Sequence, residues 1–255
     1  MKAVTTVVRG LDFAEGLRWH DGRLWYSDFY RHGVFAVVPG RAEERVLTLE
    51  TQPSGLGWLP DGRLLVVSME GRRVLRREPD GTLVTHADLS EIAGGFVNDM
   101  VVAVDGTAHV GNFGFEVWGR DEHLTATLAR VAPDGTAYAA ADGLHFPNGS
   151  VITADGRTLV VGETMAGRFS VLTIADDGTL HDRRVWAELG ASKPDGCTLD
   201  ADGAIWVADA GTARSGVATA GTRCSGGVPC SACRGRRDHA PRRGAAAGLR
   251  VRSRR

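Results

Sequence analysis

Five polar side chains recur at the same place in a repeated segment, and most of them are of a type that binds cations. The five leading residues are Glu15, Ser54, Asn98, Asn148 and Asp195. Each stands seven residues before an Asp-Gly pair, except in the first copy, where the separation is six. Four of the five carry carboxylate or carboxamide oxygens, which are the ligands that hard divalent cations prefer. If the copies surround one axis, these oxygens converge on it and form a site for one cation.

The segment that carries each leading residue predicts a β-hairpin. A short, mostly apolar stretch runs to the Asp-Gly pair and continues into a second strand-like run, and glycine accepts the positive φ that such turns require. The apolar residues alternate with period two and are rich in Val, Leu and Trp, which favours strands over helices. Successive turn aspartates lie 40, 44, 50 and 47 residues apart, a spacing typical of propeller blades.

Further strand pairs fill the intervals between these hairpins. They are expected within residues 32–49, 72–87, 127–141 and 168–186. Each blade therefore has four strands, and the sequence predicts four complete blades and the first half of a fifth, ending near Ala210. A closed ring of this kind needs at least one more blade. The prediction is an all-β propeller whose last blade is missing or replaced.

Charge divides the chain into two unlike parts. Of the 30 basic and 31 acidic residues, 11 Arg and one acidic residue fall within 214–255, which leaves 19 basic and 30 acidic residues within 1–213. Residues 1–213 are thus predicted to form an acidic, incomplete propeller. Residues 214–255, rich in Arg, Gly and Ala and poor in large apolar residues, are predicted to form a disordered tail without function.

Three interpretations of residues 214–255 compete. An Arg-rich arm for nucleic acid is disfavoured because no aromatic residues are interleaved with the arginines. A zinc site is disfavoured because its first thiol spacing is too wide; its candidate ligands are Cys224, Cys230, Cys233 and His239. A change of reading frame that replaced the last blade explains the composition best. On that interpretation neither nucleic acid nor zinc in this segment is a partner.

The nature of the axial oxygens narrows the choice of metal. Glu15 and Asp195 together carry a charge of −2, which matches one divalent cation, and neither His nor Cys occupies a leading position. Ca²⁺, Mg²⁺ or Mn²⁺ is therefore predicted, while a mixed oxygen site also accepts Zn²⁺. Asx and Ser residues at strand starts also cap turns, and Ser54 is expected to do only that. Two acids at one axis would repel each other without a cation, so capping is a weaker explanation for Glu15 and Asp195.

Four of the repeated motifs resemble those of a known family. They are FAEGLRWHDGRLWYSD, VNDMVVAVDGTAHVGNFGF, LHFPNGSVITADGRTLVVGET and KPDGCTLDADGAIWVADA. In this order they are similar to the blades of the gluconolactonase, regucalcin (senescence marker protein) and luciferin-regenerating enzyme family, over residues from about 10 to 212. The resemblance implies a six-bladed β-propeller that binds one divalent metal in its central channel and hydrolyses lactones.

The resemblance also implies roles for individual residues. The family's metal ligands fall on Glu15, Asn148 and Asp195, and Asp195 is also the expected proton acceptor. The family's Asn-Asp pair, which binds the substrate and the water on the metal, falls on Asn98 and Asp99.

One position departs from the family. Some animal members have a sugar-contacting Arg two residues before that Asn, where this chain has Phe96, which implies a different substrate.

These observations, together with the resemblance, predict a divalent-metal-dependent hydrolase that opens the ester of a sugar lactone, as a gluconolactonase does. Two alternatives stay open: a non-catalytic propeller that binds a metal or a protein, and an inactive member that lacks its last blade. Ser68, Ser150 and Ser170 lack the Gly-x-Ser-x-Gly setting of a serine hydrolase. No run of about 18 apolar residues and no signal peptide is visible, so a cytoplasmic location without membrane contact is expected.

Overall fold

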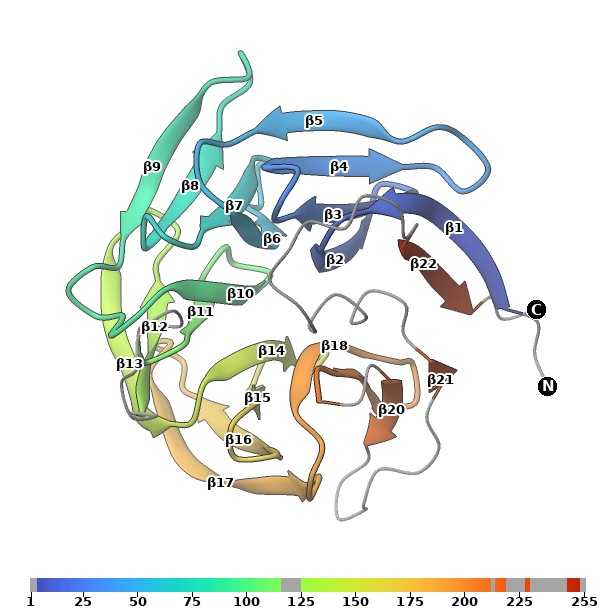
Figure 1. The fold of residues 1–255 in the computed structure, drawn as a ribbon. Coiled ribbons are helices and arrows are strands. Elements are labelled where there is room, and N and C mark those ends of the chain that lie inside the picture. The colour runs from blue at the N-terminus through green and yellow to red at the C-terminus, as the bar shows by residue number, and fades with distance from the viewer. Residues whose placement is uncertain (1–3, 116–124, 212–213, 219–227, 230–246, 253–255) are drawn as a thin grey trace.

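The computed structural model describes residues 4–115, 125–211, 214–218, 228–229 and 247–252, and the side chains of 6–115 and 125–211. These residues form strands and turns only. In this part of the chain no helix has the length and apolarity needed to cross a membrane. Five four-stranded antiparallel sheets surround a common centre, which confirms the predicted incomplete propeller (Figure 1).

Each sheet is built from four consecutive strands, so sequence neighbours are also neighbours in space. The first contains β2 (Ala14–His20), β3 (Arg23–Asp28), β4 (Gly33–Val37) and β5 (Glu44–Thr48). The second contains β6 (Pro53–Trp58), β7 (Leu64–Ser68), β8 (Arg73–Arg77) and β9 (Leu83–Asp88). The third contains β10 (Val97–Val102), β11 (Ala108–Asn112), β12 (Ala126–Val131) and β13 (Ala137–Leu144).

The fourth sheet contains β14 (Pro147–Ile152), β15 (Thr158–Glu163), β16 (Arg168–Ile174) and β17 (Leu180–Glu188). The fifth contains β18 (Pro194–Leu199), β19 (Ile205–Asp209), β20 (Arg214–Ala218) and β21 (Val228–Pro229). The strands β1 (Val4–Leu11) and β22 (Ala247–Arg252), from opposite ends of the chain, pair as a separate two-stranded sheet. In Figure 1 this pair lies between the first and fifth sheets.

The fifth sheet continues beyond Ala210, where the sequence predicted its regular strands to end. β20 pairs with β19 along five residues, and β21 pairs with two residues of β20. An edge strand such as β19 presents unpaired N–H and C=O groups, and any extended chain can satisfy them without an apolar pattern. The division of the chain at residue 213 and the change of reading frame stay predictions. The four candidate zinc ligands lie outside the described residues.

Five clusters of apolar side chains pack between neighbouring sheets, and each cluster lies at a different seam. They join β1 to the first sheet, the first to the second, the second to the third, the third to the fourth and the fourth to the fifth. In the described part of the chain, no such cluster joins the fifth sheet to the first. Consistently, Leu17 and Trp19 of β2 leave 37% and 63% of their surface exposed. Among the described side chains, apolar clusters therefore pack the four seams between consecutive sheets and the seam between β1 and the first sheet.

Glycines let the innermost strands approach one another closely. A Cβ at Gly149 of β14 would lie 2.2 Å from the carbonyl oxygen of Asp195 in β18, and Gly16 and Gly55 meet the next sheet in the same way. The glycine that follows Asp195 is different, because a Cβ at Gly196 would meet nothing within 4 Å. Gly196 is the last of the series, since β18 is the last innermost strand in the described part of the chain.

This difference gives a matched pair of variants. Gly149→Ala is expected to lower the free energy of unfolding by about 2 kcal/mol, because β14 and β18 must separate. Gly196→Ala is expected to leave it within about 0.5 kcal/mol, since the new methyl group has room. Urea unfolding of both variants checks this. Equal losses would mean that the strand approach at Gly149 does not limit the packing of the fourth and fifth sheets.

Candidate functional site

The five leading residues occupy equivalent places in the structure. Each is the second residue of the innermost strand of its sheet, in β2, β6, β10, β14 and β18. In all five sheets the pairing register shifts immediately after this position, within Glu15–Arg18, 53–56, 97–100, 147–150 and 194–197. Such a bulge bends the strand and redirects side chains. The innermost strands contact their neighbours, and β2 also contacts β10 and β18.

Asn148 and Asp195 meet directly. The Nδ2 group of Asn148 donates hydrogen bonds to Asp195 Oδ1 at 2.8 Å and to Thr164 Oγ1 at 3.2 Å. The Thr164 hydroxyl in turn donates to the Pro194 carbonyl at 2.6 Å, so its oxygen is left to accept from Asn148. Because both neighbours accept, the amide nitrogen must face them and the amide oxygen must point elsewhere. Two predicted metal ligands from different sheets are thus brought together.

The amide oxygen of Asn148 supplies the test of whether a cation fits. Asn148 is 3% exposed, and its Oδ1 is buried without a hydrogen-bond partner. A buried carbonyl oxygen without a partner costs about 1–3 kcal/mol, which a bound cation would remove. Among the described residues, no group of three or more His, Cys, Asp and Glu side chains is placed to hold a metal. The set that fits is instead a mixed one, in which Asn148 offers its amide oxygen and Asp195, hydrogen-bonded to the nitrogen of the same amide, offers a carboxylate.

The first three sheets are joined at the same level by a chain of hydroxyl groups. Ser54 Oγ donates to Asn98 Oδ1 at 3.1 Å, and Ser27 Oγ contacts the carbonyl oxygens of Ser54 at 2.7 Å and of Glu15 at 3.1 Å. Ser54, expected to cap only its own turn, therefore orients Asn98. The side chain of Glu15 is partly buried, and its backbone is anchored by Ser27.

Asp99 is held by an arginine that the sequence analysis did not identify. Asp99 is 3% exposed, and its Oδ1 accepts from Arg18 Nη2 and from the Met100 N–H, both at 2.8 Å. Arg18 also donates to the Met100 carbonyl. The pair connects β2 of the first sheet to β10 of the third, past the second. That Asp99 binds substrate stays a prediction, with one of its oxygens already engaged.

Cys197 lies in the electrostatic field of this group. Burial raises the pKa of its thiol, and the carboxylates of Asp99 and Asp195 raise it further, whereas Arg18 opposes them. The thiol is therefore protonated at neutral pH and is not a nucleophile. Asp99, Arg18 and Asp195 all act on this one thiol, so the three charged groups lie in the same region of the protein.

A second set of polar residues, at the ends of the second strands, has a structural role. Glu163 is 0% exposed and accepts hydrogen bonds from Arg168 at 2.9 and 3.1 Å, from the His145 N–H at 2.9 Å and from Ser170. Burial opposes ionisation, but the hydrogen bonds outweigh it and hold the pKa of Glu163 below its usual value. Asp28 similarly accepts from the N–H groups of 12 and 13 at 3.0 and 3.1 Å. These carboxylates anchor the loops that precede the innermost strands.

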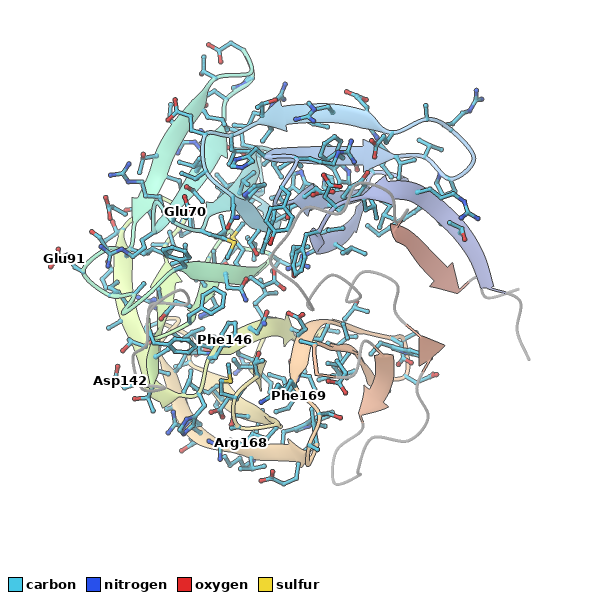
Figure 2. The ribbon with its side chains drawn as sticks, in the orientation of Figure 1. Glu70, Glu91, Asp142, Phe146, Arg168 and Phe169 are labelled. Carbon is cyan, nitrogen blue, oxygen red and sulfur yellow. The ribbon has the colours of Figure 1, made fainter. Side chains whose placement is uncertain are left out.

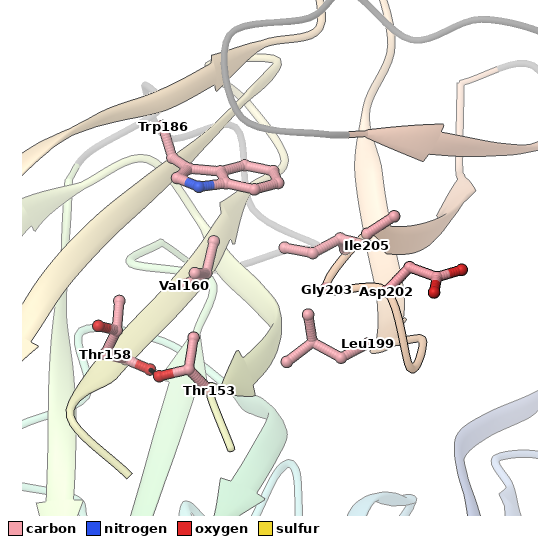
Figure 3. A pocket seen from close by; sticks show the side chains of 9 residues that line it. Thr153, Thr158, Val160, Trp186, Leu199, Asp202, Gly203 and Ile205 are labelled. Atoms are coloured by element: carbon pink, nitrogen blue, oxygen red, sulfur yellow. Dashed lines mark hydrogen bonds between the residues drawn. The ribbon is translucent and has the colours of Figure 1, made fainter. Parts of the chain in front are cut away.

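A cavity of about 400 Å³ lies elsewhere, between the fourth and fifth sheets. Figure 3 shows Trp186, Val160, Leu199 and Ile205 around it, with Asp202 and Gly203 at one side. Asp202 and Gly203 belong to the Asp-Gly turn, which is the opposite end of the hairpin from Asp195. This cavity is therefore separate from the candidate site.

Comparison with known proteins assigns the chain to a family. A sequence model described as the SMP-30/Gluconolactonase/LRE-like region matches residues 13–223, which include all five leading residues. The chain belongs to this family. Membership in the SMP-30/gluconolactonase/LRE-like family confirms the resemblance that four motifs carried, and it makes the fold a lactonase-like propeller.

Solved structures support the fold of this SMP-30/gluconolactonase/LRE-like chain. A gluconolactonase from Xanthomonas campestris superposes with a TM-score of 0.75 at 24% identity, covering 89% of this chain and 79% of that one. A calcium-binding protein, regucalcin, from Agrobacterium tumefaciens gives 0.74 at 20% identity, covering 90% and 79%. A luciferin-regenerating enzyme gives 0.76 at 15% identity, covering 91% and 81%. At these identities the superpositions establish the fold alone.

Proposed function

We propose that this chain is a divalent-metal-dependent hydrolase that opens the ester of a lactone. The observation that carries the proposal is the buried, unpartnered Oδ1 of Asn148, whose amide nitrogen bonds the carboxylate of Asp195 at the start of the innermost strands. Membership in the SMP-30/gluconolactonase/LRE-like family supports the reaction class. The site is proposed to act in the cytoplasm on a small molecule.

The charges in the site are consistent with one divalent cation. Asn148, Asp195 and Glu15 are the proposed ligands, and their two carboxylates carry −2. The third carboxylate, Asp99, is neutralised by Arg18. Calcium is the first cation to test, because the Agrobacterium relative is a calcium-binding protein; Mn²⁺, Mg²⁺ and Zn²⁺ follow.

The remaining chemistry is assigned to side chains of this chain. When bound, the cation supplies polarisation of the ester carbonyl and lowers the pKa of water. Asp195 accepts the proton of the attacking water as the water oxygen bonds to the carbonyl carbon. It then returns this proton to the ring oxygen as the carbon–oxygen bond of the ring breaks, which yields a hydroxy acid. Asn98, oriented by Ser54, donates a hydrogen bond that positions the substrate.

Chelation tests the proposal directly. With EDTA the rate of lactone opening is expected to fall at least tenfold, and added Ca²⁺ or Mn²⁺ is expected to restore it. Acid release is followed with a pH indicator and corrected for the spontaneous reaction. Calorimetric titration of the metal-free protein is expected to show one cation bound per chain. Equal rates with and without chelator would remove the metal from the mechanism, and the absence of any lactone opening would remove the hydrolase assignment.

A further inference from the structure

Four phenylalanines gather at the end of the propeller where the candidate site lies. This phenylalanine cluster consists of Phe96, Phe113, Phe115 and Phe146. Phe96 immediately precedes β10 and Phe146 immediately precedes β14, so each stands two residues before a leading Asn. Phe113 immediately follows β11, and its N–H donates to the Phe96 carbonyl at 3.0 Å. At about 3.3 Å per residue, Phe96 and Phe146 are about 7 Å along the chain from Asn98 and Asn148.

Phe113, Phe115 and Phe146 are in mutual ring contact, and Phe96 packs against the larger apolar cluster that contains them. The centroids of Phe113 and Phe146 are 4.1 Å apart, and Phe115 packs edge-on against Phe113 at 6.2 Å and against Phe146 at 6.4 Å. Figure 2 shows Phe146 between the third and fourth sheets. Phe29 and Met165, which follow the second strands of the first and fourth sheets, pack against the same group of residues. The apolar surface thus extends over the ends of several sheets.

Two observations indicate that this surface does more than fill the core. Phe146 adopts a φ of +58°, which is unfavourable for a bulky side chain and is typical of sites where function holds the backbone in place. Phe113, Phe115 and Phe146 retain 7–9% exposure, and Phe96 is only partly buried. In contrast, Leu65 and Val67 in the interior of the same cluster are 0% exposed. Phe96 is therefore the member of the phenylalanine cluster with the most accessible surface, and the other three lie beneath it in the packed cluster.

The charged groups at this end are poorly suited to a polyhydroxylated ligand. Asp28 and Glu163 are committed to backbone and side-chain donors, and one oxygen of Asp99 is bound by Arg18 and Met100. Lys193 Nζ lies 3.9 Å from the sulfur of Met165. A ligand whose non-reacting part is apolar would gain from the phenylalanine surface without leaving hydroxyl groups unpaired.

We propose that the substrate is a lactone with an alkyl or aryl substituent on its ring, rather than a polyhydroxylated sugar lactone. This inference rests on the proposed function for the reaction and on the phenylalanine cluster for the substituent. The ester group meets Asn98, Asn148 and Asp195, and the substituent lies against Phe96 and Phe146. Phe96 is the specificity-determining residue, since it is the most exposed ring of the cluster.

A series of six-membered lactones tests the inference on the unaltered protein. The kcat/KM for δ-octalactone, which carries a propyl group, is expected to exceed that for unsubstituted δ-valerolactone by about tenfold or more, because the added methylenes become buried. Glucono-δ-lactone is expected to be the poorest of the three. A larger kcat/KM for glucono-δ-lactone than for δ-octalactone would overturn the inference and leave the hydrolase assignment in place.

A substitution at Phe96 tests whether this residue causes the preference for an alkyl-substituted lactone. In Phe96→Gln the ratio of kcat/KM for δ-octalactone to kcat/KM for δ-valerolactone is expected to fall about tenfold, because the propyl group loses its apolar contact. The control is Val104→Gln at a turn position that is 97% exposed, for which neither substrate should change. An unchanged octalactone-to-valerolactone ratio in Phe96→Gln would contradict the role of Phe96.

Binding of unreactive analogues separates this inference from the proposed function. Calorimetry on the metal-free protein compares 6-propylpiperidin-2-one with piperidin-2-one, the lactam counterparts of the two alkyl lactones. Tighter binding of the propyl compound, by about tenfold, is expected even if no lactone is opened. That result without hydrolysis would support the apolar site and refute the reaction. Equal affinities for the two lactams would overturn the apolar site, whatever the outcome of the kinetic measurements.

Discussion

Asp195→Asn is expected to lower kcat for lactone opening by about 10³-fold. The substitution removes the proposed proton acceptor, an effect that is typically 10²- to 10⁴-fold for a general base. It also removes one of the two charges that offset a divalent cation, so cation affinity should fall as well. The fold is expected to persist, because the amide oxygen of the new side chain can still accept the 2.8 Å hydrogen bond from Asn148.

Three measurements separate these effects. Calorimetric titration gives the cation affinity of the variant, kinetics at saturating cation give the residual kcat, and thermal unfolding shows whether the structure is retained. Asp202→Asn is the matched control: it makes the same chemical change in the same hairpin, at the exposed turn end. A variant at Asp195 that binds the cation and keeps full activity would assign the proton acceptor elsewhere. A variant that binds the cation more weakly but keeps its kcat at saturating cation would show that Asp195 is a metal ligand and not the proton acceptor.

The second large effect concerns stability. Arg18→Met is expected to lower the free energy of unfolding by about 3–5 kcal/mol, because it leaves the carboxylate of Asp99 buried without its cationic partner. The side chain of Asp99 is 4% exposed, and that of Arg18 is 21% exposed. Methionine retains much of the apolar stem of arginine, so the loss reports mainly on the charge. Equilibrium unfolding in urea measures it.

Two further variants make the result interpretable. Arg157→Met removes one partner of an ion pair that is 3.6 Å long and exposed at 70% and 92%, and it is expected to cost less than about 1 kcal/mol. Combining Arg18→Met with Asp99→Asn removes both charges and should recover part of the loss. Similar losses for Arg18→Met and Arg157→Met would show that the Arg18–Asp99 pair is no more important than a surface contact.

The strands and turns of this protein follow from local sequence. Alternating apolar residues and turn signals predict both hairpins of the first four sheets and the first hairpin of the fifth, because burial on one face and a positive φ at glycine are local requirements. The meeting of Asn148 and Asp195 also follows, since equivalent positions of equivalent strands share one end of the ring. The hairpins and the contact between Asn148 and Asp195 could therefore be predicted from the sequence alone.

Other features depend on contacts that a local pattern does not encode. Arg18 and Asp99 are 81 residues apart, and their contact depends on a bulge in β2 and on the depth at which each strand starts. Glu163 stands at the end of β15, and it is buried because Arg168 and Ser170 bond to it from the next strand. β1 pairs with β22, but no apolar pattern in either segment predicts this pairing.

The third and fifth sheets differ in the apolar packing of their described side chains, and this difference bears on cation binding at the candidate site. Asn98 lies in a sheet that is packed on both sides, whereas Asp195 lies in a sheet held through the seam with the fourth. A small displacement of the fifth sheet would change the separation of Asp195 from Asn148, whereas Ser54 and Asn98 are joined by a hydrogen bond between the second and third sheets. A cation bound by both Asn148 and Asp195 would act as a clamp across this seam, so part of its binding energy would be spent on immobilising a whole blade.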